Sequence, residues 1–148
     1  MDAREFQDLA AEGRRHEAQG RLQEALTFFQ QAAELYGGDF LSEELYQPWA
    51  EHPRRVLREV YLDILTRMAA IHERQGSLTR ALKNYHQVMQ ADPLNDLAGQ
   101  RLMLLYARRG RKSAALQVYE DLRRALKQEL DAEPDEVTRA VYHKIFDK

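Results

Sequence analysis

Two ten-residue stretches, "GSLTRALKNY" (residues 76–85) and "GRKSAALQVY" (residues 110–119), share one pattern. Each reads Gly, four residues, Ala-Leu, two residues and then an aromatic residue. A third copy, "GRLQEALTFF", covers residues 20–29. The glycines of the first two stretches, Gly76 and Gly110, are 34 residues apart, which is the period of a helical-hairpin repeat. The sequence therefore predicts stacked helical hairpins.

The shared positions predict how two helices of a hairpin pack. They are Gly20, Gly76 and Gly110; Ala25, Ala81 and Ala115; Phe29, Tyr85 and Tyr119. Each glycine is expected to adopt the left-handed conformation that ends the first helix and reverses the chain. Each alanine is small where two helix backbones approach, and the aromatic ring four residues later fills the gap beside it. These positions are predicted to be scaffold rather than a binding site.

The rest of the chain also follows a helical period, and the alternation typical of strands is absent. We predict an all-α fold in which residues 1–148 form one domain. Its expected parts are hairpins over 4–36, 53–92 and 93–130, an insert over 37–52 and a capping helix over 134–147. Asp92 followed by Pro93 is read as a helix start, and so is the segment around Pro134. The last hairpin is expected to have a longer second helix, which ends near Leu130.

Composition narrows the class of protein. The 148 residues include no cysteine, carry a net charge of −2 and contain no apolar run long enough to span a membrane. No secretory signal is visible at the N-terminus, so a cytoplasmic location without membrane contact is expected. The five histidines lack the paired spacing of metal ligands, and no glycine-rich phosphate loop is present. We expect no cofactor, no metal and no catalytic residues.

Positive charge concentrates in residues 99–130, which hold eight basic and three acidic residues. Four of the basic residues, Arg108, Arg109, Arg111 and Lys112, surround one turn. Such a cluster could meet an acidic partner or a phosphate backbone. Compensation of helix dipoles by solvated side chains is the favoured interpretation, and no specific DNA binding by this chain alone is expected.

The insert begins with Gly37-Gly38-Asp39-Phe40, which is similar to the signature of nucleotide cyclases. That enzyme motif needs a second acidic residue and flanking strands, and both are missing here. A structural interpretation is favoured instead, in which the two glycines end a helix. The aromatic residues Phe40, Tyr46 and Trp49 are then expected to anchor the insert against the hairpins.

The repeats resemble tetratricopeptide repeats, which implies a right-handed stack of hairpins with a concave face. That resemblance places the candidate partner-binding side chains on the first helices of the hairpins; they are Thr66, Arg74, Gln100, Leu104 and Arg108. Arg74 and Arg108 could bind a carboxylate or an acidic peptide, and simple exposure at a helix end is the alternative.

A more specific resemblance covers about residues 35 to 134. The "GDFL" of residues 38–41, Trp49 with Arg55, "ALKNYHQVMQADPLND" (81–96) and the closing "EP" (133–134) resemble the bacterial transcriptional activator domain. That domain follows a winged-helix module in regulators of the Streptomyces antibiotic regulatory protein type. No such module is read from residues 1–34, so the chain is expected to be either a piece of a longer regulator or a stand-alone adaptor.

The resemblance implies a non-catalytic module for self-association or for contact with other regulator domains. The alternative is a general tetratricopeptide adaptor, or a ligand-sensing domain, outside transcription.

Overall fold

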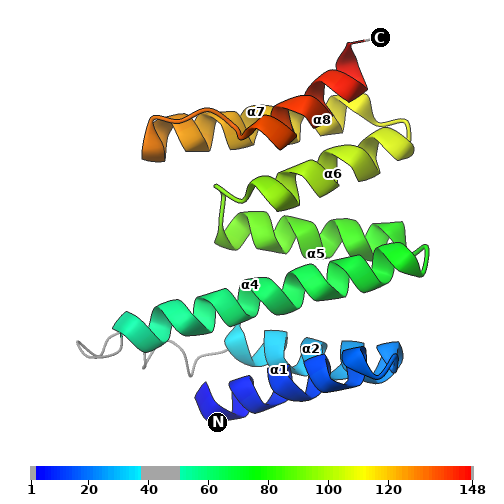
Figure 1. Cartoon of the computed structure of the whole chain (residues 1–148), viewed down its shortest axis with the longest axis vertical. Coiled ribbons are helices and arrows are strands. Elements are labelled where there is room, and N and C mark those ends of the chain that lie inside the picture. Colours follow the sequence, from blue (N-terminus) through cyan, green and yellow to red (C-terminus); the bar gives the residue numbers. More distant parts are fainter. Residues whose placement is uncertain (1–2, 38–50, 148) are drawn as a thin grey trace. The chain divides into compact units, whose positions relative to one another are not determined.

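The computed structural model describes residues 3–37 and 51–147, with the side chains of residues 51–53 excluded. Every regular element in these ranges is an α-helix, as predicted (Figure 1). The helices are α1 (Ala3–Ala18), α2 (Leu22–Tyr36), α4 (Glu51–Arg74), α5 (Leu78–Ala91), α6 (Asp96–Arg108), α7 (Lys112–Leu130) and α8 (Glu136–Phe146). None of these helices is both long and apolar enough to cross a membrane. The right-handed tetratricopeptide-like course of the stack and the single domain stay predictions.

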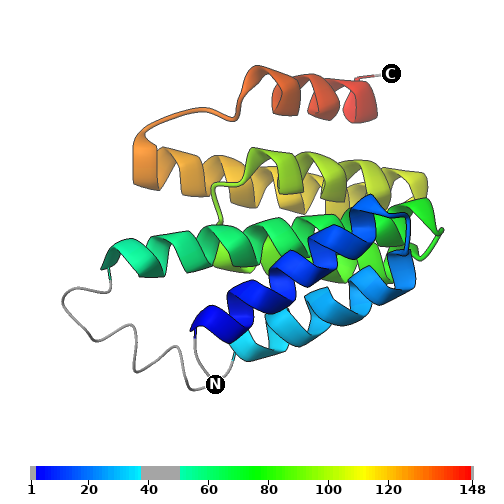
Figure 2. The same ribbon diagram turned by 60° about the horizontal axis from the view of Figure 1, so that its bottom comes forward.

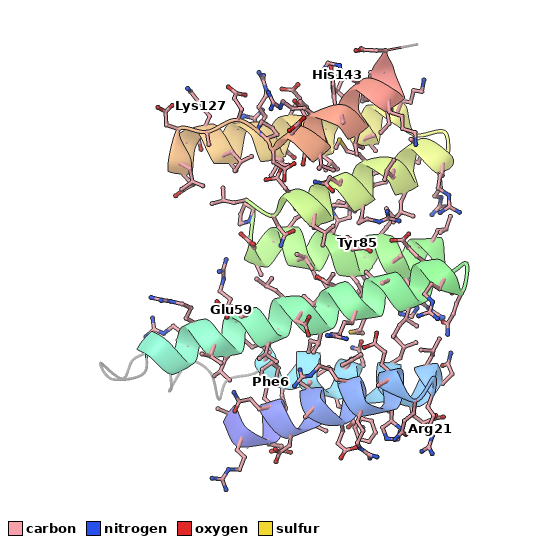
Figure 3. All side chains as sticks on the ribbon, viewed as in Figure 1. Phe6, Arg21, Glu59, Tyr85, Lys127 and His143 are labelled. Carbon is pink, nitrogen blue, oxygen red and sulfur yellow. The ribbon has the colours of Figure 1, made fainter. Side chains whose placement is uncertain are left out.

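Two compact units divide the chain, residues 1–71 and residues 72–148, with the boundary inside α4. In the first unit, α1 and α2 pack along each other, as Figure 2 shows. Phe6 and Phe29 are fully buried there (Phe6 is labelled in Figure 3). Tyr36 of α2 stacks on Tyr61 of α4, with ring centroids 4.0 Å apart. An ion pair of 2.7 Å between Glu17 and Arg67 also joins α1 to α4.

The second unit contains the end of α4 and helices α5 to α8. Helix α6 packs against α5, α7 and α8, and therefore lies at the centre of this unit. Its core residues Leu102, Met103 and Leu105 are at most 1% exposed. Since apolar burial is the main favourable contribution to folding, α6 supplies much of the stability of this unit.

The turn glycines behave as predicted. Gly20, Gly76 and Gly110 have φ angles of 77°, 76° and 72°, which lie in the left-handed region. In each turn, the amide after the glycine donates to the carbonyl five residues earlier, over 2.9, 2.8 and 2.8 Å. This is the hydrogen bond that closes a helix on a left-handed residue. The three repeat alanines are fully buried, as expected for a close approach of two helices.

Two helices begin later than predicted. Helix α6 begins at Asp96 and is capped by Asn95, whose side chain accepts from the amide of Ala98 over 2.9 Å. Asp92 instead ends α5, and its carbonyl accepts from the amide of Asn95 over 3.1 Å. Pro93 is therefore the second residue of a tight turn, which is a position that its fixed φ angle also favours.

The last helix has the same kind of offset, since α8 begins at Glu136 rather than at Pro134. Asp135 caps it by accepting from the amide of Thr138 over 2.8 Å. The predicted long second helix of the last hairpin is confirmed, because α7 ends at Leu130.

Tyr119 differs from the other two repeat aromatics. Phe29 is fully buried and Tyr85 is 3% exposed, whereas Tyr119 is only half-buried. Phe29 fits tightly because it packs against Gly13, which has no side chain. In the repeat register the residue that corresponds to Gly13 is Met103, a large and fully buried side chain. That Tyr119 fills the gap beside Ala115 therefore stays a prediction; its ring stacks on Tyr142 of α8 at 4.3 Å.

Candidate functional site

Three polar side chains of the second unit meet in a nearly closed cluster. Glu73, in the last turn of α4, accepts from the hydroxyl of Tyr85 on α5 over 2.7 Å. It also accepts from Arg101 on α6, with Nε at 3.1 Å and a second, shorter contact from Nη2. Figure 3 labels Tyr85 among the crowded side chains of the second unit. Helices α4, α5 and α6 are thus tied together by one carboxylate.

The electrostatics of this cluster favour the ionised form of the Glu73 carboxyl group. Burial acts to raise the pKa of Glu73, but hydrogen bonds from Arg101 and Tyr85, together with the charges of Arg101 and Arg108, lower it overall. Burial and the bond to Glu73 raise the pKa of the Tyr85 hydroxyl, which therefore remains a donor. Because the carboxylate is paired and hydrogen-bonded, the cluster fits a structural role better than a catalytic one.

A shallow apolar groove lies beside this cluster, between α5, α6 and α7. It encloses about 210 Å³. Its lining residues are His86, Met89, Gln90, Pro93, Leu102, Val118 and Asp121, and the set is called the α5–α7 groove below. The ring of His86 is hydrogen-bonded through Nε2 to the hydroxyl of Tyr106 at 2.7 Å. Arg111 lies over the other ring of this pair, 5.5 Å from the centroid of Tyr106.

The sequence pattern did not single out this groove. Met89 was noted only within the family-like stretch 81–96, Val118 only within the repeat copy 110–119, and Pro93 only as a helix start. They come together through the packing of α5, α6 and α7. The 34-residue register does not link them, since it pairs Val118 with Asn84, which is not among the residues that line the groove.

The predicted partner-binding residues fall into different environments. Gln100 is engaged within the chain, because its amide donates to Thr138 over 2.9 Å. Leu104 is half-buried one turn further along α6, and Arg74 and Arg108 are exposed. In the first unit, the hydroxyl of Thr66 donates to the carbonyl of Leu62 over 2.8 Å. That these five side chains bind a partner stays a prediction.

Helix α8 occupies the face of α6 that carries Gln100. Thr138 is fully buried and donates to Asp96 over 2.6 Å. The same carboxylate oxygen of Asp96 accepts from the amide of Asp135 over 3.1 Å. Both views show α8 beside α6 and α7 (Figures 1 and 2). The sequence predicted a capping helix, and these polar contacts show how it is fixed to α6.

The insert anchors Phe40, Tyr46 and Trp49, and Asp39 of the cyclase-like stretch, lie outside the described residues. In the described ranges, no group of three or more histidine, aspartate or glutamate residues is arranged to hold a metal ion.

In its described residues the chain is therefore an all-helical protein in which Glu73, Tyr85 and Arg101 join three helices. The model of the family described as "Bacterial transcriptional activator domain" matches residues 1–146. The chain therefore belongs to this family, as its sequence led us to expect.

Known regulators share the same region. The chain is 31% identical over 134 residues to the regulatory protein AfsR of Streptomyces griseus, covering 90% of this chain and 14% of that protein. It is 28% identical to the transcriptional regulatory protein MoaR1 of Mycobacterium tuberculosis, covering 90% of this chain and 43% of the relative. Identity to the regulatory protein DnrI of Streptomyces peucetius is also 28%, over 98% of this chain and 53% of DnrI. The chain thus spans between about one seventh and about half of these relatives.

Proposed function

We propose that this chain is a non-catalytic protein-interaction module of a bacterial transcriptional regulator. Its role would be self-association or contact with another domain of the same regulator, in the cytoplasm. Membership of the transcriptional activator domain family supports the regulatory setting. The observation that carries the interaction role is the α5–α7 groove, an apolar depression on a hairpin scaffold.

The chemistry of the groove suits one or two apolar side chains of a partner. Met89, Pro93, Leu102 and Val118 supply apolar surface, and His86 and Asp121 supply polar groups that can orient a neighbour. Interfaces between proteins commonly have this arrangement, with an apolar centre inside a polar rim.

A ligand-sensing role is the alternative, and the size of the groove argues against the groove as the ligand site. Ligand pockets usually enclose about 300 to 1,000 Å³. The groove encloses about 210 Å³, which is small for a ligand and adequate for a side chain. Non-catalytic action agrees with the structural role of the Glu73 cluster, in which Glu73 and Tyr85 hydrogen-bond each other.

Light scattering coupled to size exclusion, over a wide range of concentrations, tests self-association. We expect a mass that rises with concentration and a smaller rise for Met89→Glu, because this change puts a charge into the apolar groove. Gln128→Glu is the matched control, since it adds the same charge at an exposed position of α7 outside the groove. Circular dichroism must show that all three chains are equally helical.

A chain that stays monomeric at the highest concentration would remove self-association from the proposal. Contact with another domain of the regulator would then be tested by adding the remaining part of the full-length protein. If Met89→Glu and Gln128→Glu behave alike in both assays, the groove is not the interface.

A further inference from the structure

The second unit has two long stretches with basic residues and no acidic residue. Residues 74–91 contain three Arg or Lys residues, residues 97–119 contain five, and neither stretch contains Asp or Glu. Arg101 is one of these eight and is paired with Glu73. The other seven are exposed: Arg74, Arg80, Lys83, Arg108, Arg109, Arg111 and Lys112. These seven are called the basic edge below.

The basic edge lies at two neighbouring turns. Six of its residues are at the α4–α5 turn and the α6–α7 turn, which lie on the same side of the second unit in Figure 1, and Lys83 lies about one helical turn further along α5. A hydrogen bond of 3.1 Å from Arg109 to Thr79 holds the two turns together. None of the seven cations forms an ion pair with any residue whose side chain the structure describes. The seven therefore have no ion-pair partner within those ranges, although the charge of Arg108 acts on Glu73 and the whole chain has a net charge of −2.

Helix dipoles explain only part of this surplus. Arg74 and Arg108 lie at the ends of α4 and α6, where the negative end of the dipole favours a cation. Arg80 and Lys112 instead lie in the first turns of α5 and α7, at the positive end of each dipole. A cation in that position destabilises its helix.

The two helix starts at the basic edge also lack the groups that normally satisfy them. Neither α5 nor α7 has an acidic residue in its first turn, and neither has a side-chain cap. The other two helix starts of this unit have both: α6 has Asn95 and Asp96, and α8 has Asp135 and Glu136. Free backbone amides, an uncompensated dipole and cations converge at one edge, and an external anion would satisfy all three.

The lack of apolar surface distinguishes between two kinds of anionic partner. The large apolar side chains that are exposed in this unit are Leu97, Leu116, Leu130 and Val137, and none of them lies in either turn of the basic edge. A protein interface normally needs an apolar centre, whereas interfaces with DNA are more polar and far more positive. Arginine, which supplies five of the seven cations, also matches phosphate geometry.

We propose that the basic edge binds the phosphate backbone of duplex DNA without reading its sequence. This inference goes beyond the proposed protein-interaction role and uses a different surface from the α5–α7 groove. In a transcription regulator, such contacts add affinity for DNA that another part of the regulator selects, since phosphate contacts position a protein and base contacts give specificity.

The test is fluorescence anisotropy of a labelled random-sequence duplex, titrated with the whole chain at several salt concentrations. We expect weak binding whose logarithm falls linearly with the logarithm of the salt concentration. In the double variant Arg80→Glu/Lys112→Glu, binding at low salt should weaken about tenfold or more. The slope of log affinity against log salt concentration should become shallower by the amount that corresponds to about two phosphate contacts.

The matched control is Arg123→Glu/Arg124→Glu, which makes the same change in net charge on exposed residues of α7. These two arginines are paired with Glu120 and Asp121, and lie about 16 to 18 Å along the helix from Lys112, at 1.5 Å per residue. Figure 3 labels Lys127, which marks that end of α7. Binding by the control should stay within about twofold of the unchanged chain.

A second measurement separates loss of binding from loss of fold. Because Arg80→Glu and Lys112→Glu remove cations from helix starts, the double variant should melt at a higher temperature while it binds DNA less well. Equal losses of binding in the double variant and the control overturn the proposal, and so does an absence of salt-dependent binding. If polyglutamate binds at the basic edge and DNA does not, the surface is a protein contact and the proposal is wrong.

Discussion

The α1–α2 hairpin of the first unit and the α6–α7 hairpin of the second share a glycine turn and a buried alanine, but differ around both. Phe29 is fully buried against Gly13, whereas Tyr119 is half-buried and stacks on α8. After the turn between α1 and α2, the first turn of α2 carries the acidic residue Glu24. The turn between α6 and α7 has no acidic residue. The comparison teaches that the repeat positions determine the hairpin, while their neighbours determine how tightly it packs and what its surface attracts.

The largest expected difference concerns the two aromatic rings. Phe29→Ala should lower the free energy of unfolding by about 3 to 5 kcal/mol, because it leaves a cavity in a closed core. Tyr119→Ala should cost only about 1 to 2 kcal/mol, mostly through the lost stacking on Tyr142. Urea denaturation of each variant measures both values. Equal losses would mean that Tyr119 fills its hairpin as Phe29 does.

Two glycines sharpen the same contrast. A Cβ at Gly13 would lie 2.4 Å from two ring atoms of Phe29, so Gly13→Ala should cost about 1 to 3 kcal/mol through overpacking. A Cβ at Gly99 would meet only the end of the Leu122 side chain, at 3.0 Å. Leu122 can shift, and alanine favours a helix over glycine by about 1 kcal/mol. Gly99→Ala should therefore change the unfolding free energy little, and a large loss would show that the α6–α7 contact is as tight as the one at Gly13.

Reciprocal charge changes test the two helix starts. Arg80→Glu places an acidic side chain three residues after Ser77, the spacing of a capping box, and should stabilise the chain by about 0.5 to 1 kcal/mol. Glu24→Arg makes the opposite change in α2 and should destabilise by about 0.3 to 1 kcal/mol. Thermal unfolding at low salt measures both. Shifts of the same sign would contradict the account of the uncompensated start of α5.

The smallest expected effect is a dependence of stability on pH in the second unit. Burial, and then the charge of Arg80, lower the pKa of His72 from its ordinary value of 6.5. As the pH falls, His72 therefore binds a proton in the unfolded chain before it does so in the folded chain. The contribution of His72 to stability is fully present above pH 6.5 and decreases as the pH falls below that value. Arg80→Glu removes the repulsion and should reduce this decrease, as measured by urea unfolding on both sides of that pH. An unchanged decrease, equal to that of Arg123→Glu, would assign the effect to burial alone.

The repeat pattern was enough to predict the hairpins because glycine and alanine are constrained locally. A left-handed turn strongly favours glycine, and a close helix contact favours a small residue, so both can be found from spacing alone. The start of α6 was placed wrongly because Asp92-Pro93 fits a helix start and a tight turn equally well. Only the neighbouring Asn95, which takes the cap, separates the two.

The Glu73 cluster and the docking of α8 could not be predicted in the same way. Glu73 and Arg101 are 28 residues apart, and Gln100 and Thr138 are 38 apart. No local pattern links such residues, because their contacts depend on the packing of whole helices. The stacking of Tyr119 on Tyr142 of α8 could not be predicted for the same reason.

The position of α8 has a consequence for the evolution of longer chains. A further hairpin added after α7 would place its first helix against α6 and α7, where α8 is already held by Asp96 and Thr138. The exposed residues of α8 include the polar side chains of Arg139, His143 and Lys144 together with the apolar Val137. The face of α6 that a further helix after α7 would need is therefore already covered by α8.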